Sequence, residues 1–153
     1  MPIRCEIVTQ DKTLFEGEAD SVRVPGTDGE MGILPHHAPL LTTLKLGIIE
    51  VRHQGEEEIL TISGGVMEVR PDIVTILADV GENVDEIDIA RAEAARQRAE
   101  KFLAEGPVPE TDEYLRMEAA LRLSTLRLEA VRRYGRASHR RTATSSGTSS
   151  EEA

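Results

Sequence analysis

The sequence predicts a β + α protein: an N-terminal antiparallel β-sandwich of about ten short strands, a C-terminal antiparallel two-helix hairpin and a disordered tail. Three observations carry this prediction. Residues 2–84 contain short apolar runs separated by turn signals, after Gly81 the apolar period becomes helical, and from Gly135 onward no apolar periodicity remains. We therefore expect a sandwich domain at 1–84, a hairpin at 85–134 and a Ser/Thr-rich tail at 135–153.

The expected strands recur at a spacing of about 8–12 residues, which favours a sandwich or barrel over alternating βαβ units. Turn signals such as His53-Gln54-Gly55 and Pro71-Asp72 separate them. Neighbouring runs should pair as hairpins, for example Gly47–Arg52 with Glu58–Ser63. The expected strands are Ile3–Thr9, Thr13–Glu18, Ser21–Pro25, Leu41–Lys45, Gly47–Arg52, Glu58–Ser63, Val66–Arg70 and Ile73–Val80.

Two helices are expected next. The segment DIARAEAARQRAEKFLAE consists of strong helix formers and ends at Gly106-Pro107. A second helix should run from Thr111 to Arg133, and the short link between the two predicts an antiparallel hairpin. The first helix offers mainly alanine to its partner, so the backbones can come close. The expected apolar stripe of the second helix is Leu115, Ala119, Leu123, Leu126 and Ala130.

Composition excludes several classes of protein. The 153 residues carry 18 Lys+Arg against 28 Asp+Glu, a net charge of −10, with four aromatic residues and no Trp, which argues against nucleic-acid binding as the main task. The acidity is uneven: residues 1–86 have net charge −11, residues 87–134 zero and residues 135–153 +1. One cysteine, Cys5, rules out an internal disulfide and a cysteine zinc cage, and we expect a buried inert thiol. No run approaches the ~20 apolar residues of a membrane span, so a cytosolic protein is expected.

No catalytic or metal site is expected. The sequence lacks a Walker A motif, G-x-G-x-x-G and H-E-x-x-H, and shows no Ser/His/Asp arrangement. The spaced glycines of Gly26–Gly32 lie among strands, so they indicate a turn. Adjacent His36 and His37 favour a loop or interface role over a metal site, because neighbouring histidines rarely converge on one ion without further ligands.

Three motifs, in order, carry a family resemblance: GEMGILPHHAPLLTTLKLG, then GGVMEV, then IDIARAEAA. Over roughly residues 1–134 the chain resembles the epsilon subunit of F-type ATP synthases. The resemblance implies a non-catalytic rotor subunit of the central stalk that binds the gamma subunit and the ring of c subunits. It also implies coupling of proton translocation to ATP synthesis, and inhibition of ATP hydrolysis when the hairpin extends toward the catalytic alpha and beta subunits. Such a subunit is peripheral, at the cytoplasmic face of the cell membrane.

The resemblance implies two contact residues. Glu30 and His37 fall where the family's lower loop faces the gamma subunit and the c ring. Pro35 and Pro39 would stiffen this loop, which supports a contact role. The alternative is a structural loop whose apolar side chains close the sandwich, namely Ile33, Leu34 and Leu40.

The resemblance also implies a weakly bound regulatory ATP, and no other cofactor. The motif Ile87-Asp88-x-x-Arg91-Ala92 is similar to the ATP-binding motif of some bacterial epsilon subunits. Helical geometry puts Asp88, Arg91 and Arg98 within an arc of ~80°, and a carboxylate beside guanidinium groups suits a nucleotide. The remaining matched contacts are Glu82 and Arg127.

Three features weigh against a complete nucleotide site. Leu123 stands where a further phosphate-binding arginine is expected, with Arg122 one position earlier and so turned ~100° around the helix. Asp88 has an alternative role as N-cap of the first helix. Arg91 also has alternative roles, either as a solvated side chain or as the ion-pair partner of Glu93 or Glu100. At the level of function, the alternatives to a rotor subunit are a freestanding adaptor that grips another partner with its hairpin and, less favoured, a small-molecule enzyme.

Overall fold

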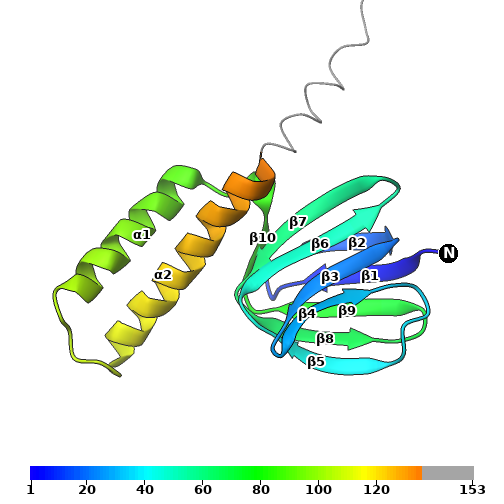
Figure 1. Ribbon diagram of the computed structural model, residues 1–153, viewed down its shortest axis with the longest axis horizontal. Helices are drawn as coiled ribbons and strands as arrows, with labels where there is room; N and C mark the ends of the chain where they lie inside the picture. The colour runs from blue at the N-terminus through cyan, green and yellow to red at the C-terminus, as the bar shows by residue number, and fades with distance from the viewer. Residues whose placement is uncertain (136–153) are drawn as a thin grey trace, which may run out of the picture. The chain divides into compact units, whose positions relative to one another are not determined.

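The computed structural model describes residues 1–135. They form two compact units, the first spanning Met1–Glu86 and the second beginning at Ile87 (Figure 1). The first unit is a sandwich of ten strands and the second a hairpin of two helices, which confirms the predicted fold class. The predicted disordered tail lies outside the described residues, apart from Gly135.

The strands of the described chain include two that the sequence did not indicate. β4 lies in the glycine-rich stretch expected to be only a turn, and β10 is three residues long, too short to show a period. The strands are β1 (Ile3–Val8), β2 (Thr13–Ala19), β3 (Ser21–Gly26), β4 (Gly29–Ile33), β5 (Leu40–Leu44), β6 (Gly47–His53), β7 (Glu56–Ile62), β8 (Gly65–Val69), β9 (Ile73–Ala78) and β10 (Gly81–Asn83).

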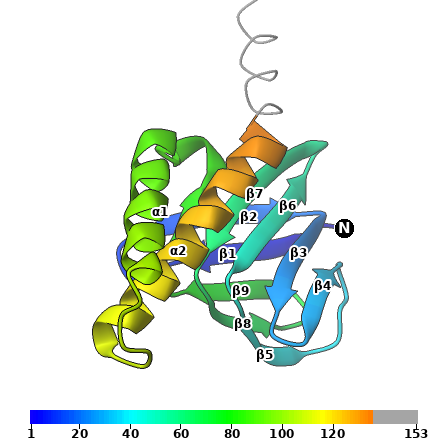
Figure 2. The same ribbon diagram turned by 60° about the vertical axis from the view of Figure 1, so that its left-hand side comes forward.

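The strands form one hydrogen-bonded path in the order β10-β7-β6-β3-β5-β8-β9-β1-β2, with β4 paired to β3 beside it. The path curls around a shared interior, as Figures 1 and 2 show. Its pairings are antiparallel except one: β1 lies parallel to β9, with Cys5 opposite Val74. The predicted hairpin of β6 and β7 is confirmed, with Arg52 opposite Glu57.

Tight turns fix the register of two hairpins. In β6–β7 the turn residues Gln54 and Gly55 both have positive φ, 50° and 77°, as a type I′ turn requires. In β3–β4 the pair Gly26 and Gly29 closes a two-residue turn. Because a shift of one residue would exchange the two faces of a strand, these turns help to decide which side chains enter the core.

The core is aliphatic. Alternate strand residues are fully buried, for example Ile49 and Val51 on β6 and Val74 and Ile76 on β9, and Phe15 is its one aromatic member among the described residues. Cys5 lies within this core with no exposed surface, as predicted. Burial, and secondarily the charge of Glu6, raises the pKa of the Cys5 thiol to about 12, so the group stays neutral and unreactive at physiological pH.

A short 3-10 turn, η1 (Val84–Glu86), follows β10, and two helices come after it. α1 (Ile89–Ala104) begins at its N-cap Asp88 and ends before Gly106, whose φ of 70° is the left-handed conformation common after a helix. α2 (Asp112–Ala130) begins at Thr111, whose hydroxyl accepts a hydrogen bond from the Tyr114 N–H at 3.2 Å. A π-helical turn, η2 (Val131–Gly135), extends α2.

The contact between α1 and α2 uses small side chains. The buried residues of the two helices are Ala92, Ala99, Ser124 and Ala130. The Ser124 hydroxyl donates back to the carbonyl of Ala120 at 2.7 Å, so this buried oxygen is satisfied within its own helix. The predicted stripe is wrong at its N-terminal end, because Leu115 is 50% exposed and Ala119 is also exposed. The larger apolar side chains of the two helices are half-buried at most, for example Phe102, Leu103 and Leu123. The hairpin therefore gains less from apolar burial than the sandwich does.

A glycine in the GGVMEV motif gives a test of the packing. A Cβ on Gly65 would lie 2.3 Å from the Leu77 carbonyl oxygen and 3.0 Å from the Ala78 Cα, both backbone atoms that cannot move without displacing β9. We expect Gly65→Ala to lower the free energy of unfolding in urea by about 1–3 kcal/mol. The matched control is Gly32→Ala, whose Cβ would meet open space. It should change stability by less than about 0.5 kcal/mol, and equal losses in the two variants would contradict the clash.

Candidate functional site

The two predicted contact residues lie on neighbouring elements of the sandwich. Glu30 is exposed on β4, so it belongs to a strand and not to the loop in which it was expected. His37 is half-buried in the loop between β4 and β5, where the preceding His36 has a φ of 66°. Ile33 is buried in the core and Leu40 packs against it, as expected if this segment closes the sandwich, but Leu34 is 60% exposed. The segment therefore both closes the sandwich and presents side chains to solvent.

Hydrogen bonds fix the conformation of the His37 loop. The His37 backbone N–H donates to the Leu34 carbonyl at 3.2 Å. The ring Nδ1 lies 2.7 Å from the Ala38 carbonyl oxygen, and because a carbonyl only accepts, Nδ1 must carry the proton. In the neutral ring this leaves Nε2 as the acceptor, so His37 can receive a hydrogen bond from a partner.

Glu30 is held by an ion pair within the sheet. Its Oε1 lies 3.3 Å from Nε of Arg23 on β3, and Arg23 also donates from Nη1 to Oε2 of Glu50 on β6 at 2.8 Å. Three adjacent strands therefore contribute one basic and two acidic groups to this face of the sheet, where Glu50 is buried and Arg23 and Glu30 are exposed. The carboxylate predicted to contact a partner is thus already oriented in the isolated chain.

The sequence interpretation missed an apolar surface. Leu41 on β5, Val66 on β8 and Leu77 on β9 are 72%, 41% and 56% exposed. Val66 pairs directly with Leu77 and with Thr43, two residues from Leu41, so the three side chains share the solvent face of the sheet. We call Leu41, Val66 and Leu77 the outer apolar patch. The signal was present in Leu40-Leu41, because consecutive apolar residues on a strand must point to opposite faces.

An acidic side chain borders this patch. Glu68 is the register partner of Leu41 and accepts a hydrogen bond from Arg70 Nε at 2.9 Å. This hydrogen bond, and then the charge of Arg70, hold the pKa of the Glu68 carboxyl below its usual value. Glu68 therefore remains ionised and paired at physiological pH, which gives the patch a charged rim typical of a protein interface.

In the hairpin, the implied nucleotide residues divide into buried and exposed groups. Asp88 Oδ1 accepts a hydrogen bond from the Arg91 backbone N–H at 3.0 Å, so the N-cap role is confirmed. Ile87 and Ala92 are buried, whereas the side chains of Arg91 and Arg98 are exposed. The structure thus brings Asp88 and the Arg91 backbone together at the start of α1.

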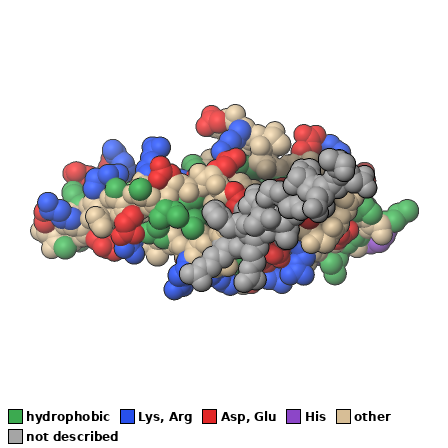
Figure 3. Space-filling view, turned by 90° about the horizontal axis from the view of Figure 1, so that it is seen from above, with side chains coloured by type: hydrophobic (Ala, Val, Ile, Leu, Met, Phe, Trp, Pro, Cys, Tyr) green, Lys and Arg blue, Asp and Glu red, His purple; other side chains and the backbone are tan. Residues whose placement is uncertain are grey.

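The other implied residues lie on different elements. Glu82 is on β10, opposite Thr61 of β7, and therefore belongs to the sandwich unit. Arg127 is half-buried on α2. Arg122 pairs with Glu118 at 3.2 Å, and Leu123, which replaces the expected arginine, is half-buried. Basic and acidic side chains are mixed on the face of the hairpin that Figure 3 shows, and this agrees with the net charge of zero over residues 87–134.

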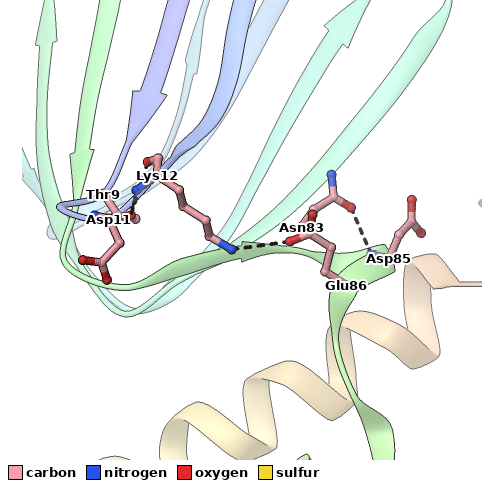
Figure 4. A network of polar contacts seen from close by, with 6 residues as sticks. All are labelled: Thr9, Asp11, Lys12, Asn83, Asp85 and Glu86. Atoms are coloured by element: carbon pink, nitrogen blue, oxygen red, sulfur yellow. Dashed lines mark hydrogen bonds and ion pairs between the residues drawn. The ribbon is translucent and has the colours of Figure 1, made fainter.

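A polar network fixes the last residues of the sandwich unit (Figure 4). Lys12 Nζ, in the β1–β2 turn, lies 3.4 Å from Glu86 Oε2. The Asn83 side-chain oxygen accepts from the Asp85 N–H at 2.9 Å, which stabilises the turn after β10. The Lys12–Glu86 pair joins the end of the sandwich unit to the β1–β2 turn.

Comparison with known proteins identifies the family. Residues 2–84 match the model of the ATP synthase delta/epsilon chain β-sandwich domain, and residues 85–132 match that of its long α-helix domain. The chain belongs to the ATP synthase delta/epsilon chain family. It is similar to the ATP synthase epsilon chain of Dehalococcoides mccartyi, with 46% identity covering 84% of this chain and 91% of the relative. It is also similar to that of Herpetosiphon aurantiacus, with 45% identity covering 86% and 96%.

A solved structure supports the same family assignment. The chain resembles one from the Euglena gracilis mitochondrial ATP synthase, OSCP/F1/c-ring, with a TM-score of 0.71 and 27% identity over 85% of this chain and 81% of that chain. Within residues 1–135, no three metal-ligating side chains gather into a site. Among the same residues, no helix is long and apolar enough to cross a membrane.

Proposed function

We propose that this delta/epsilon family chain is a non-catalytic rotor subunit of the central stalk of an F-type ATP synthase. In this role it binds the gamma subunit and the c ring, couples proton translocation to ATP synthesis, and lies peripherally at the cytoplasmic face of the cell membrane. The family match over both units is the observation that supports it. The same match favours a subunit of this complex over a freestanding adaptor.

The sandwich supplies the docking surface in this proposal. The outer apolar patch offers apolar area to the partner, Glu68 forms part of its polar rim, and Glu30 and the acceptor Nε2 of His37 add polar contacts. Exposed leucine and valine side chains on the solvent face of a sheet contribute nothing to the core, so burial against a partner would gain their transfer free energy.

Truncating one side chain of the patch tests the docking surface. We expect Leu77→Ser to weaken binding to membranes depleted of this subunit by about five- to thirtyfold, the range for a residue that contributes 1–2 kcal/mol to an interface. Binding is measured by titrating the purified chain and following ATP-driven proton pumping. The control is Val108→Ser, a still more exposed apolar side chain in the link between α1 and α2. Identical titration curves for wild type and Leu77→Ser would exclude the patch from the interface.

The hairpin supplies regulation in this proposal. No large apolar side chain of α1 or α2 is fully buried, so separating the two helices costs less apolar burial than opening the sandwich would. α2 and η2 carry Arg116, Arg122, Arg127, Arg132 and Arg133, which suit acidic surfaces of the alpha and beta subunits. Extension of the hairpin toward those subunits would inhibit ATP hydrolysis.

Removal of the hairpin tests this regulation. The cut belongs after Glu86, because β10, the buried Val84 and the Lys12–Glu86 pair are part of the sandwich unit, and a cut after Gly81 would remove them. We expect the complex containing residues 1–86 to assemble and to hydrolyse ATP several-fold faster than the complex with the full chain. Hydrolysis and pumping are measured on the same membranes. Unchanged hydrolysis with intact assembly would argue against an inhibitory hairpin.

Weak ATP binding is proposed as the effector that favours the retracted hairpin. The exposed guanidinium groups of Arg91 and Arg98 suit the phosphates, with Asp88, Glu82 and Arg127 as further contacts, and Ile87 and Ala92 complete the motif. A ligand shifts a conformational equilibrium only by its differential affinity for the two states.

Calorimetric titration with Mg-free and Mg-bound ATP tests this binding. We expect heat at millimolar nucleotide for the wild-type chain and a loss of affinity of about ten- to 150-fold for Arg91→Ala, since a charge-assisted hydrogen bond contributes about 1.5–3 kcal/mol. Arg116→Ala removes an equally exposed arginine outside the motif and serves as control. The absence of heat from the wild-type chain at millimolar ATP would remove ATP from the mechanism.

A further inference from the structure

Three charged residues form a chain across the outer face of the sheet, which we call the Glu50–Arg23–Glu30 chain. Arg23 Nη1 donates to Glu50 Oε2 at 2.8 Å, and Arg23 Nε lies 3.3 Å from Glu30 Oε1. The exposure of the side chains rises along it, from 10% at Glu50 through 52% at Arg23 to 67% at Glu30. Glu50 therefore forms the better-shielded end and Glu30 the end most open to a partner.

The strand register explains why these residues meet. Arg23 on β3 is directly opposite Glu50 on β6 and directly opposite Gly32 on β4. Glu30 is two residues before Gly32 on β4, so it occupies the diagonal position relative to Arg23, within reach of a long side chain. Because Gly32 has no side chain, no group directly opposite Arg23 on β4 competes for the guanidinium.

The chemistry of arginine suits the middle position. A guanidinium presents several N–H groups in a fixed plane, so one side chain can serve two carboxylates from different nitrogens, as Nη1 and Nε do here. An exposed ion pair is usually weak, because two flexible side chains must be ordered to form it. Glu50 has already ordered Arg23 through its shorter contact, so only Glu30 remains to be ordered.

We propose that Glu50 and Arg23 are positioning residues for Glu30. They hold the Glu30 carboxylate on β4 in the orientation in which it meets the central-stalk partner. Neither Glu50 nor Arg23 needs to touch that partner, and both act through Glu30. This inference rests on the proposed function, in which Glu30 is a contact residue, and it adds two residues that neither the motifs nor the resemblance indicated.

A double-mutant cycle in the assembled complex tests the proposal. The full chain and its variants are titrated into membranes depleted of this subunit, and ATP-driven proton pumping reports binding. We expect Arg23→Gln and Glu50→Gln each to weaken binding about two- to fivefold, the effect of losing an exposed or partly exposed ion pair. In a Glu30→Gln background, the same two substitutions should weaken binding less than about 1.5-fold further, because the residue they orient has lost its charge.

Matched controls separate positioning from a general loss of sheet stability. Arg52 on β6 pairs with Glu57 on β7 through Nε and Oε1 at 3.1 Å, which is the same kind of cross-strand pair. Arg52→Gln and Glu57→Gln make the same charge changes and should leave binding unchanged. Losses equal to those of Arg23→Gln would show that any broken cross-strand pair weakens binding, and would overturn the proposal.

The failure of this inference differs from the failure of the proposed function. If Glu30→Gln alone leaves binding unchanged, Glu30 is not a contact residue, and the docking proposal fails at this position together with the inference. If Glu30→Gln weakens binding but Arg23→Gln and Glu50→Gln have no effect, or their effects add fully to it, the positioning role alone is excluded.

A measurement on the free full-length chain tests the order of the contacts. The Nε–H of Arg23 faces Glu30, so its exchange with water, followed in a 15N NMR spectrum, should be several-fold faster in Glu30→Gln than in the wild type. It should also be several-fold faster in Glu50→Gln, although Glu50 contacts Nη1 and not Nε, because Glu50 is the residue that orders the guanidinium. Equal exchange rates in the wild type and Glu50→Gln would overturn the proposal.

Discussion

Burial of alternate side chains in one shared aliphatic core is the constraint from which the sandwich follows. Once Ile49 and Val51 must point inward from β6, Glu50 between them must point outward, where its register partner is Arg23. The same rule turns Leu41, Val66 and Leu77 outward, because Leu40, Met67 and Ile76 beside them belong to or pack against the core. The outer apolar patch and the charged chain are thus consequences of the register that the core selects.

The core accommodates this arrangement because most of its side chains are small or of medium size. Val and Ile side chains fill most of it. Glycine is needed where a Cβ would meet the backbone of a neighbouring strand, as at Gly65 beside the Leu77 carbonyl. The fully buried side chains of the hairpin are also small, as at Ala92, Ala99 and Ser124. There, however, small side chains bury little area, so the hairpin gains much less from packing than the sandwich does.

Periodicity predicted the strands with clear alternation and both helices, but contacts between distant segments lay beyond it. β4 was not predicted because glycines interrupt its alternation of apolar and polar residues, and Glu30 was therefore expected in a loop. The outward face of α2 was misjudged at Leu115 and Ala119, since a helix with apolar residues on several sides does not reveal which side meets its partner. The Arg23 contacts depend on which strands become neighbours, and the parallel pairing of β1 with β9 likewise has no local signal.

The unequal packing of the two units bears directly on the proposed regulation. Local opening requires least free energy where few apolar contacts are lost, and the contiguous aliphatic core cluster lies entirely in the sandwich. A movable hairpin on an unchanging sandwich is therefore the division that this packing favours. A nucleotide that binds only one hairpin state stabilises that state by RT ln(1 + [ATP]/Kd), about 0.4 kcal/mol when its concentration equals Kd, so the proposed weak binding changes the populations only if the two states lie within about 1 kcal/mol. Tight ATP binding would instead fix one state and remove the response to changes in nucleotide concentration.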